Sequence, residues 1–294
     1  MGRAAPLALA VDIGGTKLAA GLVDRNGRLV RRQQRPTSGT DAEALFASLA
    51  ELTREVLDAS RERPVVCGVG CGGPMTRDGE AVSPLNIPEW RGFALRGRLA
   101  DLVDRPTFVD NDAKALALGE GWVGAAAGAE NFLAMVVSTG VGAGIVLDGR
   151  LLHGAAGNAG HLGHTIVEPD GRPCVCGARG CLEAEASGLA IAAATGRPAA
   201  EATTEVIERT GRLVGRAVAS TANLLDLRLA CVAGSVALGF GEPFFSAAQA
   251  ELDASARLEF SRGARIVPAG LGADAPLIGA AAVGWSGLDG TRPR

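Results

Sequence analysis

The sequence predicts an α/β protein built from two compact lobes with similar layouts. The chain has 294 residues, 47% of them apolar, which is enough to form more than one hydrophobic core. A three-stranded meander followed by a helix and a buried strand opens the chain. A similar pattern of strand, Gly-rich turn and strand begins again at Phe132. Two similar halves within one chain indicate a duplicated fold.

The first lobe is predicted from short apolar runs and the turn signals between them. Strands of the meander are expected at residues 7–11, 18–23 and 27–32, separated by Gly-Gly and Arg-Asn-Gly turns. Apolar residues recur at helical spacing in residues 41–61, and Asp41 is placed to cap the start of that helix. A Val-rich run at residues 65–69, bounded by Pro64 and Gly70, is typical of a buried strand in a parallel sheet. The predicted order is therefore βββαβ.

The second half repeats this layout. Strands are expected at residues 132–137 and 145–147, with a Gly-rich turn at residues 139–144 between them. The turn at residues 148–151 then repeats the Asp, Gly, Arg and Leu of residues 24–29. Chance likeness is the alternative, because Gly-punctuated strand pairs resemble one another. The other expected elements are Ala-rich helical stretches at residues 113–127 and 189–225, a strand at 229–233 and a closing helix at 280–285.

Charge and hydropathy argue against nucleic acid or a membrane as partner. The formal net charge is −3, and the arginines are scattered, whereas phosphate binding needs clustered basic residues. No apolar run approaches the length that spans a bilayer. The opening apolar run continues into Asp12 without a cleavage region, so we interpret it as a first strand and not as a secretory signal.

The cysteines favour a metal site in a reducing, cytoplasmic setting over disulfide bonds. Three of the six crowd into residues 174–181, together with glycines that permit a tight turn. One imidazole and three thiolates make a closed tetrahedral set for a structural zinc ion. The four ligands are His164, Cys174, Cys176 and Cys181. Free thiols packed as small hydrophobes are the weaker interpretation, because the segment is polar and Gly-rich.

Two Gly-rich turns are candidates for holding phosphate. The first, at residues 12–17, follows a strand, and its paired glycines let the backbone approach a phosphate while Asp12 could hold magnesium. The second, at residues 138–144, offers hydroxyls and backbone N–H groups. Each turn could instead be only a hairpin connection. Neither matches the Walker pattern, so a P-loop enzyme is disfavoured.

A third constellation lies where an apolar strand ends just before an Ala-rich helix. It reads Val109-Asp110-Asn111-Asp112-Ala113. Phosphoryl transfer asks the protein for a base that accepts the proton of the attacking hydroxyl, and Asp112 can supply it. The alternative is a helix cap, which is a common use of Asp and Asn. This segment alone favours the cap.

Taken together, these motifs resemble the ROK family (repressor, open reading frame, kinase), and specifically its glucokinase-like sugar kinases. They occur in the family's order and span most of the chain. The matching motifs are residues 12–17, Asn111-Asp112-Ala113, residues 139–144, Gly163-His164 and residues 174–183.

The resemblance implies an actin-like ATPase (ribonuclease H-like) fold, with two βββαβα lobes around an interlobe cleft that binds ATP and a hexose. We expect a small N-terminal lobe at residues 1–112, completed by a C-terminal helix at 276–294, and a large lobe with the zinc loop at 113–275. The implied cofactors are ATP with Mg²⁺ and a structural Zn²⁺. A homodimer is expected by resemblance alone.

The resemblance also implies roles for individual residues. Asp112 is the catalytic base that takes the proton from the sugar 6-hydroxyl. His164 serves twice, because one ring nitrogen binds zinc while the other donates to a sugar oxygen. The substrate-binding residues are Asn86, Asn111, Asp112, His161, His164 and Glu183. The ATP- and phosphate-binding residues are Asp12, Gly14, Gly15, Thr16, Lys17, Thr139, Gly140, Gly142 and Gly234.

One position departs from the family pattern. The family reads Gly-Glu-x-Gly-His where this chain has Gly160-His161-Leu162-Gly163-His164. A carboxylate accepts several hydrogen bonds, whereas a neutral imidazole accepts one and donates one. The substrate is therefore either glucose or a close relative, or an amino- or N-acylamino-hexose. A non-catalytic sugar sensor of the same family is a further alternative. A DNA-binding repressor is disfavoured, because the first strand begins within the opening residues and no basic recognition helix is evident.

Overall fold

The computed structural model describes residues 5–39 and 41–290, which form two compact units. Among these residues the first unit contains 5–39, 41–127, 153–159 and 271–290, and the second contains 128–152 and 160–270. No helix in the described part of the chain combines the length and the apolar character needed to cross a membrane.

The first unit is built on a five-stranded sheet in the order β3-β2-β1-β4-β5. The first three strands form an antiparallel meander, and β4 and β5 then run parallel to β1. The meander expected from the sequence is therefore confirmed. The strands are β1 (Leu7–Ile13), β2 (Lys17–Asp24), β3 (Leu29–Pro36), β4 (Val66–Cys71) and β5 (Thr107–Asn111).

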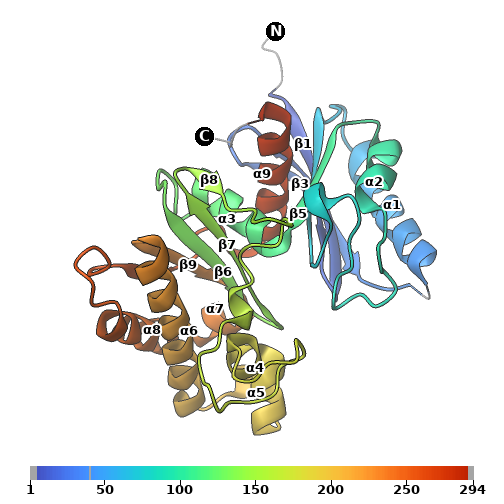
Figure 1. Ribbon diagram of the computed structural model, residues 1–294. Helices are drawn as coiled ribbons and strands as arrows, with labels where there is room; N and C mark the ends of the chain where they lie inside the picture. The colour runs from blue at the N-terminus through green and yellow to red at the C-terminus, as the bar shows by residue number, and fades with distance from the viewer. Residues whose placement is uncertain (1–4, 40, 291–294) are drawn as a thin grey trace. The chain divides into compact units, whose positions relative to one another are not determined.

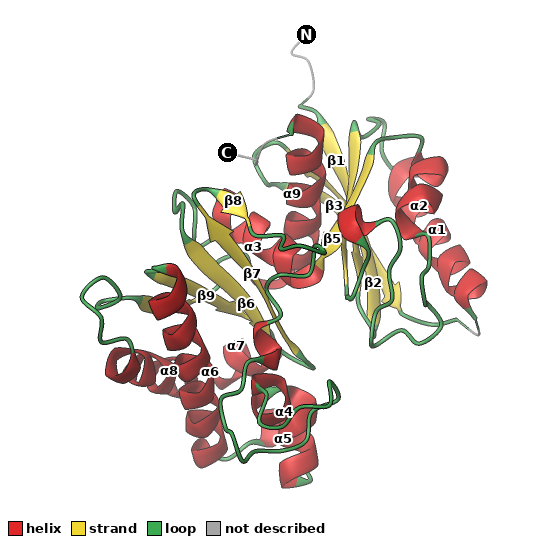
Figure 2. Ribbon diagram, viewed as in Figure 1, coloured by secondary structure: helices red, strands yellow, loops and turns green. Residues whose placement is uncertain are grey.

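Helices cover both faces of this sheet (Figures 1 and 2). The helices α1 and α2 lie on one face, and α3 and α9 on the other. The carboxylate of Asp41 accepts a hydrogen bond from the backbone N–H of Ala44 (2.9 Å), which confirms Asp41 as the cap of α1. The helices are α1 (Ala42–Asp58), α2 (Leu95–Val103), α3 (Asp112–Val123) and α9 (Ala275–Asp289).

The C-terminal helix α9 is part of the first unit. It packs against β1, β4 and α3. The backbones approach so closely that a Cβ at Gly68 on β4 would overlap the carbonyl oxygen of Ala280. This packing keeps α3 with the first unit, so that unit runs to residue 127 and not to the expected boundary at 112.

The second unit repeats the topology of the first. Its sheet has the order β10-β9-β6-β7-β8, with antiparallel β6, β7 and β8 and with β9 and β10 parallel to β6. Both units thus follow the expected βββαβα layout, and each adds a fifth strand to it. The strands are β6 (Phe132–Val137), β7 (Val141–Leu147), β8 (Arg150–Leu151), β9 (Leu229–Ala233) and β10 (Arg265–Pro268).

The helices of the second unit close its core. The two long helices α6 and α8 lie side by side, and their buried residues pack with those of β6 and β9. The helices are α4 (Leu182–Ala186), α5 (Gly188–Thr195), α6 (Thr204–Leu225), α7 (Ser235–Phe240) and α8 (Glu242–Ser255).

Two expected elements of the second unit differ from the structure. The stretch at residues 189–225 is two helices and not one, because Gly196 ends α5 in the left-handed region (φ 70°) and α6 begins only at Thr204. The Gly-rich turn at residues 139–144 is strand from Val141 onward, where glycines pair with β6. The helices α2, α4, α7 and α8 and the strand β10 have no counterpart among the elements expected.

Candidate active site and metal centre

Three parallel strands of the first unit end at the same edge of its sheet and bring acidic residues there. Asp12 on β1 lies opposite Gly70 on β4, and Gly70 lies opposite Asp110 on β5. Asn111 ends β5, and Asp112 begins α3 directly after it. The carboxyl ends of parallel strands are where open α/β sheets bind ligands. The sequence-predicted residues of this unit therefore gather at one edge.

Asn111 and Asp112 both lie at the start of α3. The side-chain Oδ1 of Asn111 accepts a hydrogen bond from the backbone N–H of Ala113 (3.1 Å) and so caps α3. The Asp112 carboxylate accepts from the same N–H (2.8 Å), and its residue is exposed. Asp112 is thus held at the first position of the helix, within reach of a ligand from solvent.

Asp12 is a carboxylate that binds its proton unusually tightly. Burial, and secondarily the negative charge of Asp112, raises the pKa of Asp12 to about 7, while the ammonium of Lys17 acts in the opposite direction. Gly70 lies next to both residues: a Cβ there would be in ordinary van der Waals contact, 3.6 Å from Asp12 Oδ1 and 3.8 Å from Asp112 Cα. A cation bound between these groups would lower the pKa of Asp12 again.

The first Gly-rich turn is a tight connection between β1 and β2. Gly14 N–H donates to the carbonyl of Lys17 (3.0 Å), and Thr37 Oγ1 donates to the carbonyl of Gly14 (2.6 Å). A Cβ at Gly15 would lie only 2.6 Å from Asn86 Cβ, so Asn86 packs directly on the turn. The structure therefore brings a residue predicted to bind sugar against the residues predicted to bind phosphate. Thr16, between Gly15 and Lys17, is exposed.

The second turn is shorter than expected and already engages a carboxylate. The Val141 N–H donates to Glu183 Oε2 (2.9 Å), and Glu183 also lies over Gly140. Gly142 lies within β7, opposite Val136, so it is a strand residue and not part of a loop. In the turn itself, Thr139 is exposed and Gly140 is half-buried.

Gly234, predicted to contact adenosine, lies beside this turn. Its φ is 101°, and a Cβ there would overlap the carbonyl oxygen of Val137. The next residue, Ser235, shares a hydrogen bond with Ser138 through their hydroxyls (2.9 Å). The turn after β6 and the turn after β9 are thus joined.

His161 and His164 belong to a segment that packs along β7. The rings of the two histidines lie 6.1 Å apart between centroids, with 24° between their planes. Gly160 and Gly163 allow this segment to pack on the strand, because a Cβ at either would overlap a carbonyl oxygen of β7. His161 is exposed and His164 half-buried.

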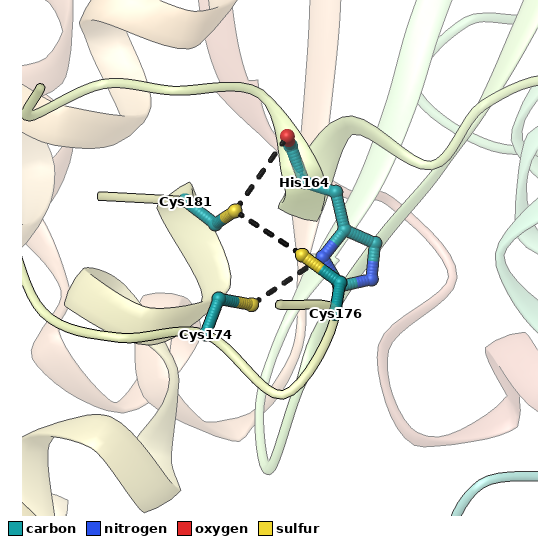
Figure 3. Close-up of side chains that lie close together, drawn as sticks. All are labelled: His164, Cys174, Cys176 and Cys181. Carbon is teal, nitrogen blue, oxygen red and sulfur yellow. Dashed lines mark hydrogen bonds between the residues drawn. The ribbon is translucent and has the colours of Figure 1, made fainter. Parts of the chain in front are cut away.

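The four predicted zinc ligands converge (Figure 3). Their ligand atoms all lie within 4.8 Å of one another. Cys174 Sγ is 3.6 Å from His164 Nδ1, and Cys176 Sγ is 3.6 Å from Cys181 Sγ. A tetrahedral zinc ion requires about 3.8 Å between two sulfurs and about 3.6 Å between sulfur and imidazole nitrogen. The donor set and these two spacings therefore fit a tetrahedral zinc ion.

The protonation of these thiols also bears on metal binding. Burial, together with the neighbouring thiols, raises the pKa of Cys181 to about 12. Metal binding must therefore displace a proton from Cys181. Since Nδ1 of His164 faces Cys174, its Nε2 lies on the other edge of the ring.

A buried carboxylate that the sequence analysis did not single out holds the start of the zinc loop. Glu185, 2% exposed, accepts from the backbone N–H of Arg172 (2.6 Å) and from the guanidinium of Arg209 (2.7 Å). Burial alone would raise the pKa of Glu185, but these donors outweigh it and lower the pKa. Its only sequence signal is its place two residues after Glu183 in a short apolar helix.

The profile of the ROK family matches residues 8–285. The chain belongs to the ROK family. This ROK protein is 36% identical over 250 residues to the N-acetylmannosamine kinase of Citrobacter koseri, a match that covers 79% of this chain and 84% of the relative.

Solved structures of ROK proteins share the whole fold. The ROK hexokinase from Thermus thermophilus matches with a TM-score of 0.85 and 33% identity, over 97% of this chain and 99% of that one. The ROK family glucokinase from Streptomyces griseus, solved in complex with glucose and AMPPNP, matches with a TM-score of 0.83 and 29% identity, over 95% of this chain and 99% of that one. The actin-like fold expected for this ROK protein is thereby confirmed.

Proposed function

We propose that this ROK protein is a kinase that transfers the γ-phosphoryl group of ATP to the 6-hydroxyl of a hexose. The observation that carries the proposal is the exposed carboxylate of Asp112, held at the first position of α3 beside the half-buried carboxylate of Asp12. The kinase names of the N-acetylmannosamine kinase and glucokinase relatives support the reaction class.

Asp112 acts as general base. Its carboxylate accepts the proton of the sugar 6-hydroxyl as that oxygen attacks the γ-phosphorus, and the bond from phosphorus to the β,γ-bridging oxygen breaks. The hydrogen bond from Ala113 N–H fixes the carboxylate at the helix start. A fixed acceptor reduces the entropy that must be lost when the hydroxyl is aligned.

The two turns are the proposed phosphate-binding elements. Bound Mg²⁺ would neutralise charge on the phosphates, and Asp12 is the residue proposed to hold it. In the first unit Gly14, Gly15, Thr16 and Lys17 offer backbone N–H groups, a hydroxyl and an ammonium. In the second unit the proposed residues are Thr139, Gly140, Gly142 and Gly234.

The proposed sugar ligands are hydrogen-bonding side chains from both units. The first unit offers Asn86 and Asn111, and the second offers His161, His164 and Glu183. His164 would hold zinc through Nδ1, the nitrogen beside Cys174, and its Nε2–H would then donate to the sugar. Zinc here is structural, because three thiolates and one imidazole leave no coordination position open.

The substrate is a hexose, with two candidates. Glucose or a close relative is supported by the likeness to the Streptomyces griseus glucokinase. An amino- or N-acylamino-hexose is supported by His161, which replaces a carboxylate, and by the 36% identity to an N-acetylmannosamine kinase. A site built for particular hydrogen-bonding groups rejects analogues that leave its polar groups unpaired.

A substrate panel tests this proposal. Glucose, mannose, their 2- and 3-amino forms and their N-acetylated forms are incubated with ATP and Mg²⁺, and ADP release and the phosphorylated position are measured. We expect phosphate on the 6-hydroxyl of one or a few of these sugars. The variant His161→Glu should change the ratio of kcat/KM between acylated and free hexoses by about tenfold or more. Calorimetric sugar binding without transfer would instead establish a non-catalytic sensor.

The assembly and location of the enzyme are also proposed from its family. We propose a cytoplasmic homodimer, in keeping with ATP as the phosphate donor and with thiolates that must stay reduced to bind zinc. Sedimentation at twice the mass of the chain would support the dimer, and sedimentation at the mass of one chain would exclude it.

A further inference from the structure

Lys114 is a buried cation next to the proposed base. Its side chain is 1% exposed and belongs to the first turn of α3, two residues after Asp112. Its ammonium donates to the carbonyl oxygen of Gly157 (2.6 Å) and lies 3.6 Å from Asp110 Oδ1. Burying an ammonium is costly unless it is paired and hydrogen-bonded, and these two contacts meet that condition.

The Gly157 carbonyl belongs to a segment with an unusual place in the chain. Residues 153–159 are part of the first unit, although the chain before and after them belongs to the second. The segment closes on itself through a hydrogen bond from Ala159 N–H to the carbonyl of His153 (2.9 Å). Its other polar contacts with the rest of the first unit are longer. Asn158 Nδ2 is 3.4 Å from the carbonyl of Met75, and His153 Nδ1 is 3.9 Å from Asp110 Oδ2.

Among the described residues, Lys114 therefore makes the shortest polar contact between this segment and the rest of the first unit. Gly157 precedes His161 by four residues, and Lys114 follows Asp112 by two. One side chain thus links the helical turn that carries the proposed base to the segment that leads to a proposed sugar ligand.

We propose that Lys114 is a positioning residue of the kinase, which holds residues 153–159 against the first turn of α3 and so sets the sugar-binding geometry. This inference rests on the proposed function for its catalytic consequence, but the anchoring itself can be tested without turnover. Lys114 acts through the segment and is not itself a catalytic residue.

The chemistry of the pair favours this role over one in stability alone. The neighbours of Lys114 on α3, Ala113 and Ala115, are small and buried, and an apolar residue in place of a buried ion pair is often neutral or stabilising. Burial raises the pKa of Asp110, while the opposing effect of Lys114 is larger than that of His153. The ion pair of Lys114 and Asp110 is thus a weak source of stability. The Lys114 ammonium is nevertheless a specific hydrogen-bond donor to the Gly157 carbonyl.

The test compares Lys114→Met with the double variant Asp110→Asn/Lys114→Met. Met removes the donor and leaves Asp110 buried without its cation, so the single variant should lose both thermal stability and sugar kcat/KM, the latter by tenfold or more. The double variant removes both charges. It should regain stability but not kcat/KM, because the Gly157 carbonyl still lacks its donor. Recovery of kcat/KM together with stability would overturn the proposal.

Hydrogen exchange supplies a readout that is independent of activity. In Lys114→Met and in the double variant, the amides of Gly157 and Ala159 should exchange tenfold or more faster than in the wild type. The control is Leu52→Ala, which removes a buried side chain from α1 and should lower stability without changing exchange in residues 153–159 or the KM for sugar. Unchanged exchange in Lys114→Met overturns the anchoring role. If the wild type phosphorylates no sugar, the proposed function fails and exchange alone decides the role of Lys114.

Discussion

Asp12 and Asp112 share one edge of a sheet but have different environments. Asp12 is half-buried and its pKa is raised, whereas Asp112 is exposed at a helix start. Two carboxylates in different environments can have different roles. Here the less exposed Asp12 is proposed to hold a cation, and the exposed Asp112 is proposed to accept a proton. His164 is likewise proposed to use its two ring nitrogens differently, with Nδ1 beside Cys174 and Nε2 on the other edge of the ring.

The raised pKa of Asp12 makes a prediction about stability and pH. Between its ordinary value, 3.8, and its value in the folded chain, about 7, the folded state keeps a proton that the unfolded state releases. The contribution of Asp12 to stability is therefore present at pH 4 and is lost as the pH rises through 7. Asp12→Asn removes this dependence, so its urea midpoint relative to the wild type should rise between pH 4 and pH 8.

The control for this titration is Asp101→Asn, which changes an exposed aspartate on α2. Its midpoint relative to the wild type should stay constant over the same range. A difference between Asp12→Asn and the wild type that does not change with pH would contradict the assignment of the raised pKa to Asp12.

At the scale of elements, two groups of contacts hold the loop that carries the proposed zinc ligands. One is the group of four ligands at residues 164–181, and the other is Glu185, which binds the backbone and side chain at the start of the loop. A loop rich in glycine and polar residues buries too little apolar surface to be ordered by packing. A bound metal would therefore contribute directly to its stability.

Replacing an exposed proposed zinc ligand separates the effect of metal loss from the effect of lost packing. Cys176 is exposed, so Cys176→Ala removes a ligand without leaving a cavity. The variant should lose its bound zinc, melt at a lower temperature and show a raised KM for sugar, because His164 is no longer held. Metal analysis and calorimetry provide the readouts.

Cys67→Ala is the matched control, since Cys67 is buried on β4 of the other unit and is not a ligand. It should lose stability through packing but keep its zinc. A chelator should lower the melting temperature of Cys67→Ala and leave that of Cys176→Ala unchanged. Equal stability of Cys176→Ala and the wild type would argue against a structural metal.

The sequence predicted elements best where local pattern and tertiary environment agree. The strands at residues 132–137 and 229–233 match β6 and β9 residue for residue, because apolar runs bounded by turns are buried there. Gly142 and Gly144 suggested a turn, yet both pair with β6 as residues of β7. Gly196 has a left-handed φ that a helical pattern does not reveal.

The residues of the site also differ in whether local sequence pattern or tertiary contact reveals them. The convergence of the four proposed zinc ligands could be predicted because three of them lie within eight residues of one another. The link from Lys114 to Gly157 could not, because it joins a side chain to a backbone carbonyl 43 positions away. The only local hint is a lysine in an Ala-rich helix, four residues after Asp110.

At the scale of the whole molecule, two units with one topology carry different parts of the proposed machinery. The first contains the proposed base and magnesium ligand, and the second contains the zinc loop and most of the proposed sugar ligands. Each unit has a turn between its first and second strands. The second unit inserts the zinc loop between its third strand and α4, where the first has only a short connection to α1.

The central claim is that the carboxylate of Asp112 is the base of a phosphoryl transfer. Its most direct test is Asp112→Asn, which keeps the size and the hydrogen-bond acceptor of the side chain but removes its basicity. The rate of sugar phosphorylation should fall by about 10²- to 10⁴-fold, with calorimetric sugar affinity close to that of the wild type. Near-normal turnover by Asp112→Asn would contradict the account.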